Sequence, residues 1–292
     1  MPELPEVETI VRQLNKYVAG CTITDVWTDN YKNQAGLTWA KFRSNLTNKK
    51  IIAVERQGKN ILIYLTQDLV LWIHLKLTGH LLLGKYIWKN RQWQPLDKGA
   101  YLDPQNRFIH WVFNLNNKKQ LVLADTRKFA KVILLPTHKI KQEKGLQDLG
   151  RDPLTPDFTE ADLRQLLSKT KSDIKKVLMD QTYLSGIGNI YANEILFQAR
   201  INPFKKANQL TGADIHNLFL AIRAVLIKAI KYQGTSAEDE AYRMLNGSPG
   251  SFAKFLQVYQ KEGQKCPRCN TIIKRVISQN RSTFYCPKCQ KI

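Results

Sequence analysis

The feature that most constrains this chain is a set of four cysteines near its C-terminus, in the spacing C-x2-C-x16-C-x2-C. Two residues between ligands let a tight turn point both thiolates at one tetrahedral ion, and a second such turn completes the site. The spacing therefore predicts one structural zinc ion. All four positions would be filled by thiolates, from Cys266, Cys269, Cys286 and Cys289, with none left open for catalysis.

The alternative for these cysteines is a pair of disulfides. The first eight residues carry three Glu and no basic group, unlike a secretory or transit segment, and no run of about 18 apolar residues could span a bilayer. We therefore expect a cytoplasmic protein, nucleoid-associated if bacterial, in which a cysteine cluster favours metal over disulfides. The fifth cysteine, Cys21, stands alone in an apolar-leaning stretch and is expected to be a buried, inert thiol.

Charge indicates the kind of partner. Lys and Arg outnumber Asp and Glu by 45 to 24, a net charge of +21, which implies a polyanion: DNA, RNA or an anionic membrane. Residues 263–292 hold seven Lys or Arg and no acid, and the stretch between the cysteine pairs predicts a β-hairpin that turns near Ser278–Arg281. Arg281 at this turn would either enter a nucleic-acid groove or be a solvated charge.

The N-terminal half is expected to be rich in β-structure. Apolar residues at helical spacing, with Pro5 in the first turn and Gly20 at the end, predict a helix over Glu3–Val18. Residues 21–135 contain short apolar runs separated by Gly, Asn, Asp or Pro, which predicts an antiparallel sandwich or barrel. Residues 136–158, rich in Pro, Gly, Lys and Asp, are expected to be a linker.

From Thr159 the pattern becomes helical, beginning with a capping box formed with Asp162. Further helices are expected over Ser172–Met179, Tyr191–Ala199 and Thr211–Gln233, followed by a mobile stretch at 234–251. The predicted fold class is therefore α+β and multidomain. Its expected parts are 1–135, the linker 136–158, a helical domain 159–262 and a zinc segment 263–292.

The first residues offer a nucleophile. The initiator Met is normally removed before a small second residue, and removal of Met1 would leave Pro2 with a free secondary amine. Such an amine attacks an aldehyde-like carbon and gives an iminium, which acts as an electron sink. Glu3, beside it, could protonate a sugar oxygen. The alternative is that Pro2 and Pro5 only shape the start of the first helix.

A series of motifs resembles those of the bacterial formamidopyrimidine-DNA glycosylases, in order and over nearly the whole chain. The motifs are PELPEVET at 2–9, Gly58–Lys59, His74–Leu75, Thr78–Gly79, DTRKF at 125–129, GIGNIYA at 186–192, GSPG at 247–250 and RSTFYC at 281–286. The resemblance implies a β-sandwich catalytic domain with an N-terminal helix, a helical domain with a helix–two-turn–helix, and a zinc-ribbon hairpin. Double-stranded DNA would lie in the cleft between them.

The same resemblance implies a base-excision enzyme that removes oxidised purines, namely 8-oxoguanine and formamidopyrimidines, and then cuts the strand. Pro2 would attack C1′, expel the base and form a Schiff base that leads to β,δ-elimination. Glu3 would act as acid and base, Glu6 would support it, and Lys59 would grip phosphate or assist proton transfer. The protein would be a monomer with one structural zinc ion, no organic cofactor and no membrane partner.

The resemblance also implies which residues hold the DNA. Asn189, in the GIGN turn at a helix N-terminus, suits a phosphate, because backbone N–H groups and the helix dipole favour an anion there. Such enzymes evert the damaged base and fill the vacated space. The other expected phosphate contacts are Lys175, Arg281, His74 and His110, and the expected space-filling residues are Leu77, Arg127 and Phe129.

The sequence departs from the family pattern around the space-filling residues. Leu77 stands where the family commonly has Met, and the neighbours Lys76, Thr126 and Ala130 replace a usual Gly, Pro and Gly. These changes bear on lesion search and on the preferred opposite base, which the sequence leaves open, as it does the preferred lesion. The segment 234–251 would close over the everted base, and its Ala-Glu-Asp-Glu stretch is longer and more acidic than is typical.

Alternatives follow from the same residues. An endonuclease VIII-like enzyme for oxidised pyrimidines usually has Gly where this chain has Leu4. A catalytically silent DNA-binding protein of the same fold would result if Met1 stayed attached. A zinc-ribbon transcription or topoisomerase module leaves the N-terminal half unexplained. Trp88 and Trp93, in a long aromatic loop, would stack on bases or, as we expect, pack in the core.

Overall fold

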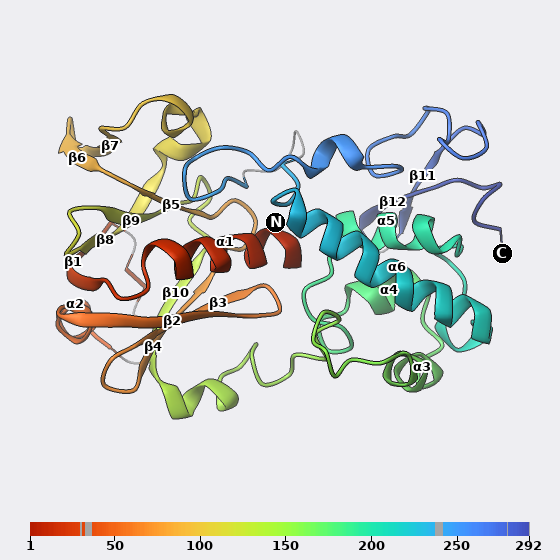
Figure 1. The fold of residues 1–292 in the computed structure, drawn as a ribbon, viewed down its shortest axis with the longest axis horizontal. Coiled ribbons are helices and arrows are strands. Elements are labelled where there is room, and N and C mark those ends of the chain that lie inside the picture. Colours follow the sequence, from red (N-terminus) through yellow and green to blue (C-terminus); the bar gives the residue numbers. More distant parts are fainter. Residues whose placement is uncertain (30, 33–36, 237–241, 279, 292) are drawn as a thin grey trace. The chain divides into compact units, whose positions relative to one another are not determined.

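The computed structural model describes residues 1–29, 31–32, 37–236, 242–278 and 280–291 (Figure 1). The chain forms two compact units, and both are discontinuous in sequence. The first unit comprises Met1–Gln147 and Tyr232–Ala253, and the second comprises Asp148–Lys231 and Lys254–Ile292. Residues expected to form a linker belong to both units, with a short 3-10 helix at Thr137–Gln142 in the first. The predicted four-part division stays a prediction.

The first unit is an antiparallel β-sandwich, as predicted. Its strand order is β10-β4-β3-β2-β1-β8-β9-β5, and only two residue pairs join β1 to β2, so the sheet divides there into two four-stranded halves. The strands are β1 (Thr22–Thr28), β2 (Lys49–Gln57), β3 (Asn60–Leu65), β4 (Leu69–His74), β5 (His80–Gly84), β8 (Ile109–Leu115), β9 (Gln120–Ala124) and β10 (Lys131–Pro136).

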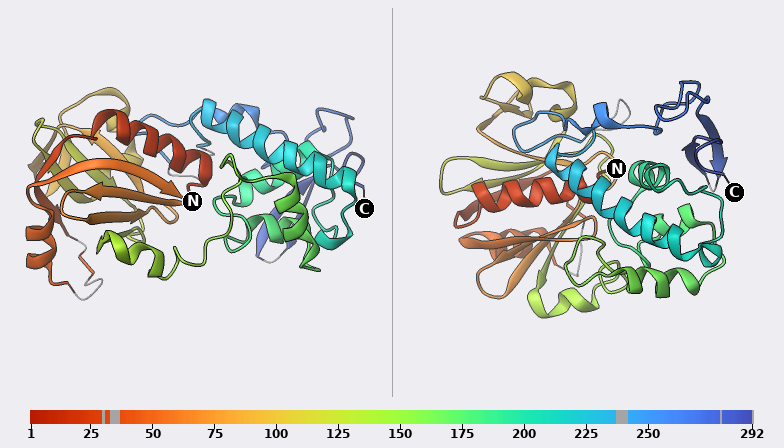
Figure 2. Two further views of the ribbon diagram at one scale, coloured as in Figure 1. Left: turned by 60° about the horizontal axis from the view of Figure 1, so that its bottom comes forward. Right: turned by 45° about the vertical axis from the view of Figure 1, so that its right-hand side comes forward.

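Helix α1 (Leu4–Tyr17) lies between the two halves of the sheet, as both Figure 1 and the right-hand view of Figure 2 show. Its apolar face, including Val7, Ile10 and Leu14, is fully buried in the core that both halves share. Each such side chain contributes about 1.5–3 kcal/mol by leaving water. The short helix α2 (Trp39–Leu46) covers the same core with Phe42 and Leu46.

Part of the segment expected to be mobile completes this core. Tyr242, Met244 and Leu245 are buried in it, and the backbone N–H of Leu83 donates to the carbonyl of Leu245 at 2.7 Å. The low apolar content of the segment predicted mobility, but these three side chains are part of the core. The acidic stretch at 237–240 lies outside the described residues.

A small hairpin, β6 (Tyr86–Lys89) with β7 (Gln92–Pro95), carries the two tryptophans of the aromatic loop. Their rings lie 5.1 Å (Trp88) and 5.7 Å (Trp93) from that of Trp27 on β1. Trp93 is partly buried against a small core cluster, but Trp88 is 48% exposed. The expected core packing is therefore right for Trp93 and wrong for Trp88, which lies at the rim of the cluster.

The second unit is helical and ends in a hairpin. Its helices are α3 (Glu160–Ser168), α4 (Ile174–Met179), α5 (Asn189–Ala199) and α6 (Gly212–Lys231), and its strands are β11 (Lys274–Ser278) and β12 (Arg281–Tyr285). The predicted capping box at α3 is confirmed, since Thr159 and Asp162 bond reciprocally. The hairpin turns between Ser278 and Arg281, as predicted. Across the described ranges of both units, no helix is long and apolar enough to cross a bilayer.

Candidate active site

The N-terminal residues that carry the proposed chemistry are buried and held by a capping box. The side chain of Glu3 caps α1 by accepting from the third backbone N–H of the helix, and the side chain of Glu6 accepts from the backbone N–H of Glu3 at 2.8 Å. Pro2 is buried, and Glu3 and Glu6 are 3% and 0% exposed. The Glu3 carboxyl is therefore fixed beside Pro2, at the helix end where the dipole favours negative charge.

Glu6 also bonds a distant segment. Its second carboxylate oxygen accepts from the backbone N–H of Thr235 at 2.7 Å. The adjacent Gly234 has φ of +80°, and a Cβ there would lie 2.8 Å from the Glu6 side chain. Only glycine fits this close approach. One buried carboxylate therefore connects the start of α1 to the start of the segment that is expected to cover the everted base.

Lys59 stands in the two-residue turn between β2 and β3, and it is 6% exposed. The turn is tied to α1 through Arg56, which donates to Glu8 at 2.8 Å and to the carbonyl of Gly58 at 3.2 Å. Burial of Glu8 opposes its ionisation, but hydrogen bonds from Arg56 and Arg12 outweigh this and lower the pKa of Glu8. The helix that begins beside Pro2 therefore also positions the turn that carries Lys59.

His74, at the end of β4, is a neutral donor among lysines. Burial, followed by the charges of Lys76, Lys59 and Lys131, lowers the pKa of His74 to about 3. Its Nδ1 accepts from the backbone N–H of Lys76 at 3.0 Å, so the hydrogen of the neutral ring is on Nε2. A neutral N–H donor within a lysine cluster is suited to a phosphate oxygen.

The three residues predicted to fill the vacated space lie on two loops of the first unit. Leu77, 37% exposed, is on the loop between β4 and β5, and Phe129, 50% exposed, is on the loop between β9 and β10. The guanidinium of Arg127 stacks 5.3 Å from the centre of the Phe129 ring. We call Leu77, Arg127 and Phe129 the wedge residues. Apolar side chains exposed on a loop are of the kind that enters an opened base step, and this role stays a prediction.

His110, on β8, makes a different contact from the predicted one. Its Nδ1 bonds the carboxylate of Asp29 at 2.9 Å, and Asp29 also accepts from Lys128 at 3.1 Å. The histidine is 9% exposed. Asp29 thus connects His110 to Lys128, on the loop that carries Arg127 and Phe129. The phosphate contact of His110 stays a prediction.

In the second unit, Asn189 is the first residue of α5, as the GIGN motif predicts. Gln181 holds the preceding turn by donating to the carbonyl of Ile187 and accepting from the N–H of Gly186, both at 2.8 Å. The side chain of Asn193 donates to the carbonyl of Asn189 and accepts from the N–H of Phe284 on β12. Asn193 therefore links the predicted phosphate site to the hairpin.

Lys175 and Arg281 line one pocket of about 260 Å³. The ammonium of Lys175 is buried and donates to the carbonyl of Ser282 at 2.8 Å and to the hydroxyl of Thr283 at 2.9 Å. Lys175 thus fixes the hairpin strand that begins with Arg281. The exposed Arg281 is the better placed of the two for phosphate, and both phosphate contacts stay predictions.

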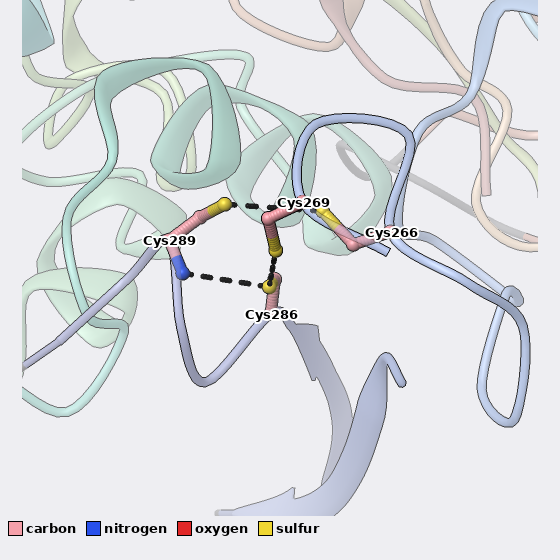
Figure 3. A group of neighbouring side chains, drawn as sticks. All are labelled: Cys266, Cys269, Cys286 and Cys289. Carbon is pink, nitrogen blue, oxygen red and sulfur yellow. Dashed lines mark hydrogen bonds between the residues drawn. The ribbon is translucent and has the colours of Figure 1, made fainter. Parts of the chain in front are cut away.

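The four cysteines come together as predicted (Figure 3), with all ligand sulfurs within 4.8 Å of one another. The Sγ atoms of Cys266 and Cys289 are 3.9 Å apart, and those of Cys269 and Cys286 are 3.4 Å apart. A tetrahedral zinc–thiolate site requires about 3.8 Å between sulfurs. The residues therefore fit one structural zinc ion, and none of the cysteines forms a disulfide.

The expectation for Cys21 is wrong, because this thiol is partly exposed. It follows the last turn of α1, where the chain reverses into β1, and Asn117 donates to its sulfur at 3.3 Å. The surrounding apolar residues point into the core, but the turn itself lies at its edge.

Sequence reasoning missed the polar residues that hold the zinc segment and the stretch before it against α5 and the residues that follow it. Arg268 donates to the carbonyl of Phe197 at 2.6 Å and stacks on its ring at 4.3 Å. The buried Gln290 donates to the carbonyl of Ile201 at 2.9 Å. Glu194 accepts from three consecutive backbone N–H groups, at 257–259, and burial raises its pKa. No local pattern marks these residues, because their partners are distant in sequence.

Comparison with known proteins agrees with this arrangement. Residues 1–132 match the formamidopyrimidine-DNA glycosylase N-terminal domain, 149–241 the H2TH domain of the same enzymes, and 263–292 a zinc finger found in FPG and IleRS. A formamidopyrimidine-DNA glycosylase of Pelotomaculum thermopropionicum is 40% identical over 292 residues, covering all of both chains.

Two solved structures from Lactococcus lactis are similar over the full chain. One is a complex of its Fpg with DNA containing an abasic site, with a TM-score of 0.84 and 34% identity over 99% of this chain and all of the other. The second is a complex of a point variant of that enzyme with DNA containing Fapy-dG, with a TM-score of 0.85 and 33% identity over all of both chains.

Proposed function

The chain belongs to the formamidopyrimidine-DNA glycosylase family, and from this premise we propose that it excises oxidised purines from duplex DNA through a Schiff base on Pro2. It is a base-excision DNA glycosylase, and the proposal concerns its lesion, its nucleophile and the strand cleavage that follows. The observation that carries the proposal is the capping box, because it fixes a buried carboxyl beside the N-terminal proline.

Each step of the proposed reaction uses a residue of the first unit. After loss of Met1, the Pro2 amine forms a bond to C1′ and the bond from C1′ to the base breaks. The departing base takes up the proton that the amine loses. Protonation of the sugar ring oxygen by Glu3 opens the ring and yields the iminium. The Glu3 carboxylate then takes up a proton from C2′, and the electrons of that C–H bond pass through the iminium system to break the C3′–O bond. Loss of the C4′ proton breaks the C5′–O bond in the same way, so that β- and then δ-elimination expels both phosphates.

The remaining predicted residues hold the DNA. We propose that Lys59 and His74 bind phosphate in the first unit and that Asn189 and Arg281 bind it in the second, with support from Lys175. We also propose that His110 contacts a phosphate. The zinc ion, held by the four cysteines, would fix the hairpin that presents Arg281 and would take no part in catalysis.

Borohydride trapping tests this mechanism. The wild-type enzyme is incubated with duplexes that carry 8-oxoguanine, formamidopyrimidine or an oxidised pyrimidine, and the intact mass reports whether Met1 is present. We expect a covalent adduct on the two purine lesions, little adduct for Pro2→Gly, and a rate about 10²–10⁴-fold lower for Glu3→Gln. Both variants should still bind DNA.

Three outcomes would overturn parts of this proposal. Turnover of 8-oxoguanine by Pro2→Gly at the wild-type rate would exclude Pro2 as the nucleophile. A retained Met1 with no adduct would indicate a silent DNA-binding protein. Faster excision of the oxidised pyrimidine would assign the endonuclease VIII-like specificity instead.

We further propose that the enzyme acts as a monomer on the bacterial nucleoid. The support is its net charge of +21, which favours association with DNA. A fluorescent fusion that spread evenly through the cell, rather than following the DNA, would contradict this location.

A further inference from the structure

One buried carboxylate, that of Asp125, serves both loops that carry the wedge residues. Asp125 follows β9 directly and is 1% exposed. One of its oxygens accepts from the backbone N–H of Arg127 at 3.2 Å, and the other accepts from those of Phe129 and Ala130, both at 2.7 Å. The carboxylate therefore fixes the backbone at two wedge residues, Arg127 and Phe129, and at the adjacent Ala130.

The fourth donor comes from the other loop. The hydroxyl of Thr78, next to Leu77, donates to the same carboxylate. The loops leave neighbouring strands at one end of the sheet, since His80 at the start of β5 pairs with Ala124 at the end of β9. Gly79 makes the turn tight enough for this bond, because a Cβ there would lie 2.4 Å from the carbonyl oxygen of Leu75.

The chemistry of this site requires a carboxylate. Four donors converge on two oxygens, and hydrogen bonds to an ionised acceptor are shorter and stronger than neutral ones. An amide offers one oxygen only, so its NH₂ group would face at least one backbone N–H that then loses its partner. Among the described residues, Thr78 is the one side chain that bonds the Asp125 carboxylate, and the other three donors are backbone N–H groups.

We propose that Asp125 is the positioning residue of the wedge, which holds Leu77, Arg127 and Phe129 in register before the DNA arrives. The inference rests on the proposed function. A loop that is already ordered loses less conformational freedom when it inserts between bases. Asp125 therefore acts on the opening of the duplex and not on the chemistry at Pro2.

The test separates duplex opening from strand cleavage. Single-turnover excision is measured on a duplex with 8-oxoguanine opposite cytosine, and 2-aminopurine beside the lesion reports wedge insertion by its fluorescence. Cleavage of an abasic site in a single strand is measured in parallel, because that substrate needs no wedge. The variants are Asp125→Asn, Thr78→Val and a control, Asp25→Asn, which alters a carboxylate of the same unit that pairs with Arg43.

We expect Asp125→Asn to slow excision and the fluorescence change together, by about tenfold or more, as for loss of hydrogen bonds to a charged group. Thr78→Val, which leaves the three amide donors in place, should slow both by about two- to fivefold. Cleavage of the single strand should stay within about twofold of wild type for both, and Asp25→Asn should match wild type throughout.

The proposal is overturned if Asp125→Asn excises from duplex at the wild-type rate, or if it slows both substrates equally. If Asp125→Asn does not fold, Thr78→Val decides: an unchanged duplex rate and fluorescence would overturn the proposal. If the wild-type enzyme neither excises the lesion nor forms an adduct, the proposed function is wrong, and this result is independent of the Asp125 variants.

Discussion

At the scale of single residues, carboxylates connect the segments that carry the candidate active site. Glu6 joins the start of α1 to Thr235, Glu8 joins α1 to the turn at Gly58 through Arg56, and Asp125 joins two loops. Each is buried or partly buried, and each is satisfied by more than one donor. Removing a donor from such a group costs more than removing a surface ion pair.

The contact of Arg56 with the β2–β3 turn gives a residue-scale prediction. Arg56→Lys keeps the charge but loses the forked contact with Glu8 and Gly58, so we expect the free energy of unfolding to fall by about 1–3 kcal/mol. Excision should also slow, because Lys59 loses its support. Urea unfolding and single-turnover kinetics measure the two effects.

Arg12→Lys is the matched control, since Arg12 pairs with the same Glu8 but its side chain is 66% exposed. We expect it to change stability by less than about 0.5 kcal/mol. Equal effects of the two substitutions would show that the turn does not depend on Arg56.

The two shifted histidines predict how stability depends on pH. The pKa of His74 is about 3 and that of His80 about 4 in the folded chain, both below the ordinary value of 6.5, chiefly because of burial. At a pH between the folded pKa of each histidine and 6.5, the unfolded chain binds more protons than the folded chain. Stability is therefore full above about pH 6.5 and falls as the pH drops toward 4, by at most about 1.4 kcal/mol per pH unit for each histidine.

Urea unfolding between pH 7 and pH 4 checks this dependence, and His74→Asn should flatten it. A histidine ring that titrates near pH 6.5 in the folded protein, followed by NMR, would contradict the assignment of His74 as a neutral donor.

At the scale of elements, the sequence predicted those features that depend on residues close together in the chain. The helix at the N-terminus, the capping box at Thr159, the hairpin turn before Arg281 and the zinc spacing all follow from residues a few positions apart. Contacts between distant residues could not be predicted in this way. Thr78 and Asp125 are 47 positions apart and Glu6 and Thr235 are 229 apart, so no periodicity connects them.

Helix α5 shows the same limit within one element. Its apolar residues and its N-terminal GIGN turn were predicted, although it begins at Asn189, two residues before the expected start. Asn193 and Glu194 are buried because they bond the zinc hairpin and the segment before it, and no local pattern predicts these bonds. The family resemblance indicated the candidate site residues, but it did not indicate the residues that position them.

The dependence of the hairpin on metal gives an element-scale prediction. In Cys266→Ser, the zinc site loses one thiolate, so we expect zinc content to fall and DNA affinity to drop as Arg281 loses its place, while α3 to α6 stay folded. Metal analysis, fluorescence anisotropy with a lesion duplex and circular dichroism measure these three properties. Cys21→Ser is the control, because Cys21 lies outside the cluster. Full DNA affinity in zinc-free Cys266→Ser would show that the hairpin does not contribute to binding.

At the scale of the whole molecule, the main feature is that each unit is built from two separate stretches of chain. The first unit is closed by Tyr242, Met244 and Leu245, which lie almost 100 residues beyond Gln147. Loss of one large buried side chain costs about 2–5 kcal/mol, and a domain's total stability is about 5–15 kcal/mol. The N-terminal stretch therefore cannot reach full stability without its closing segment.

Fragments test this dependence. We expect residues 1–147 alone to lack a cooperative urea transition, and the same stretch joined through a long Gly/Ser linker to residues 232–253 to regain one. Tyr242→Ala in the joined chain should lower its transition midpoint. A fragment 1–147 that unfolds as cooperatively as the joined chain would show that the closing segment is dispensable.

The discontinuous first unit has a consequence for synthesis. A ribosome releases the chain from its N-terminus, so α1 and strands β1 to β10 emerge long before Tyr242, Met244 and Leu245. All four helices of the second unit precede those residues and leave the exit tunnel first. During translation, the unit that carries Pro2 therefore lacks these three core side chains until they are synthesised. The core of the first unit therefore closes only as the last sixth of the chain is made.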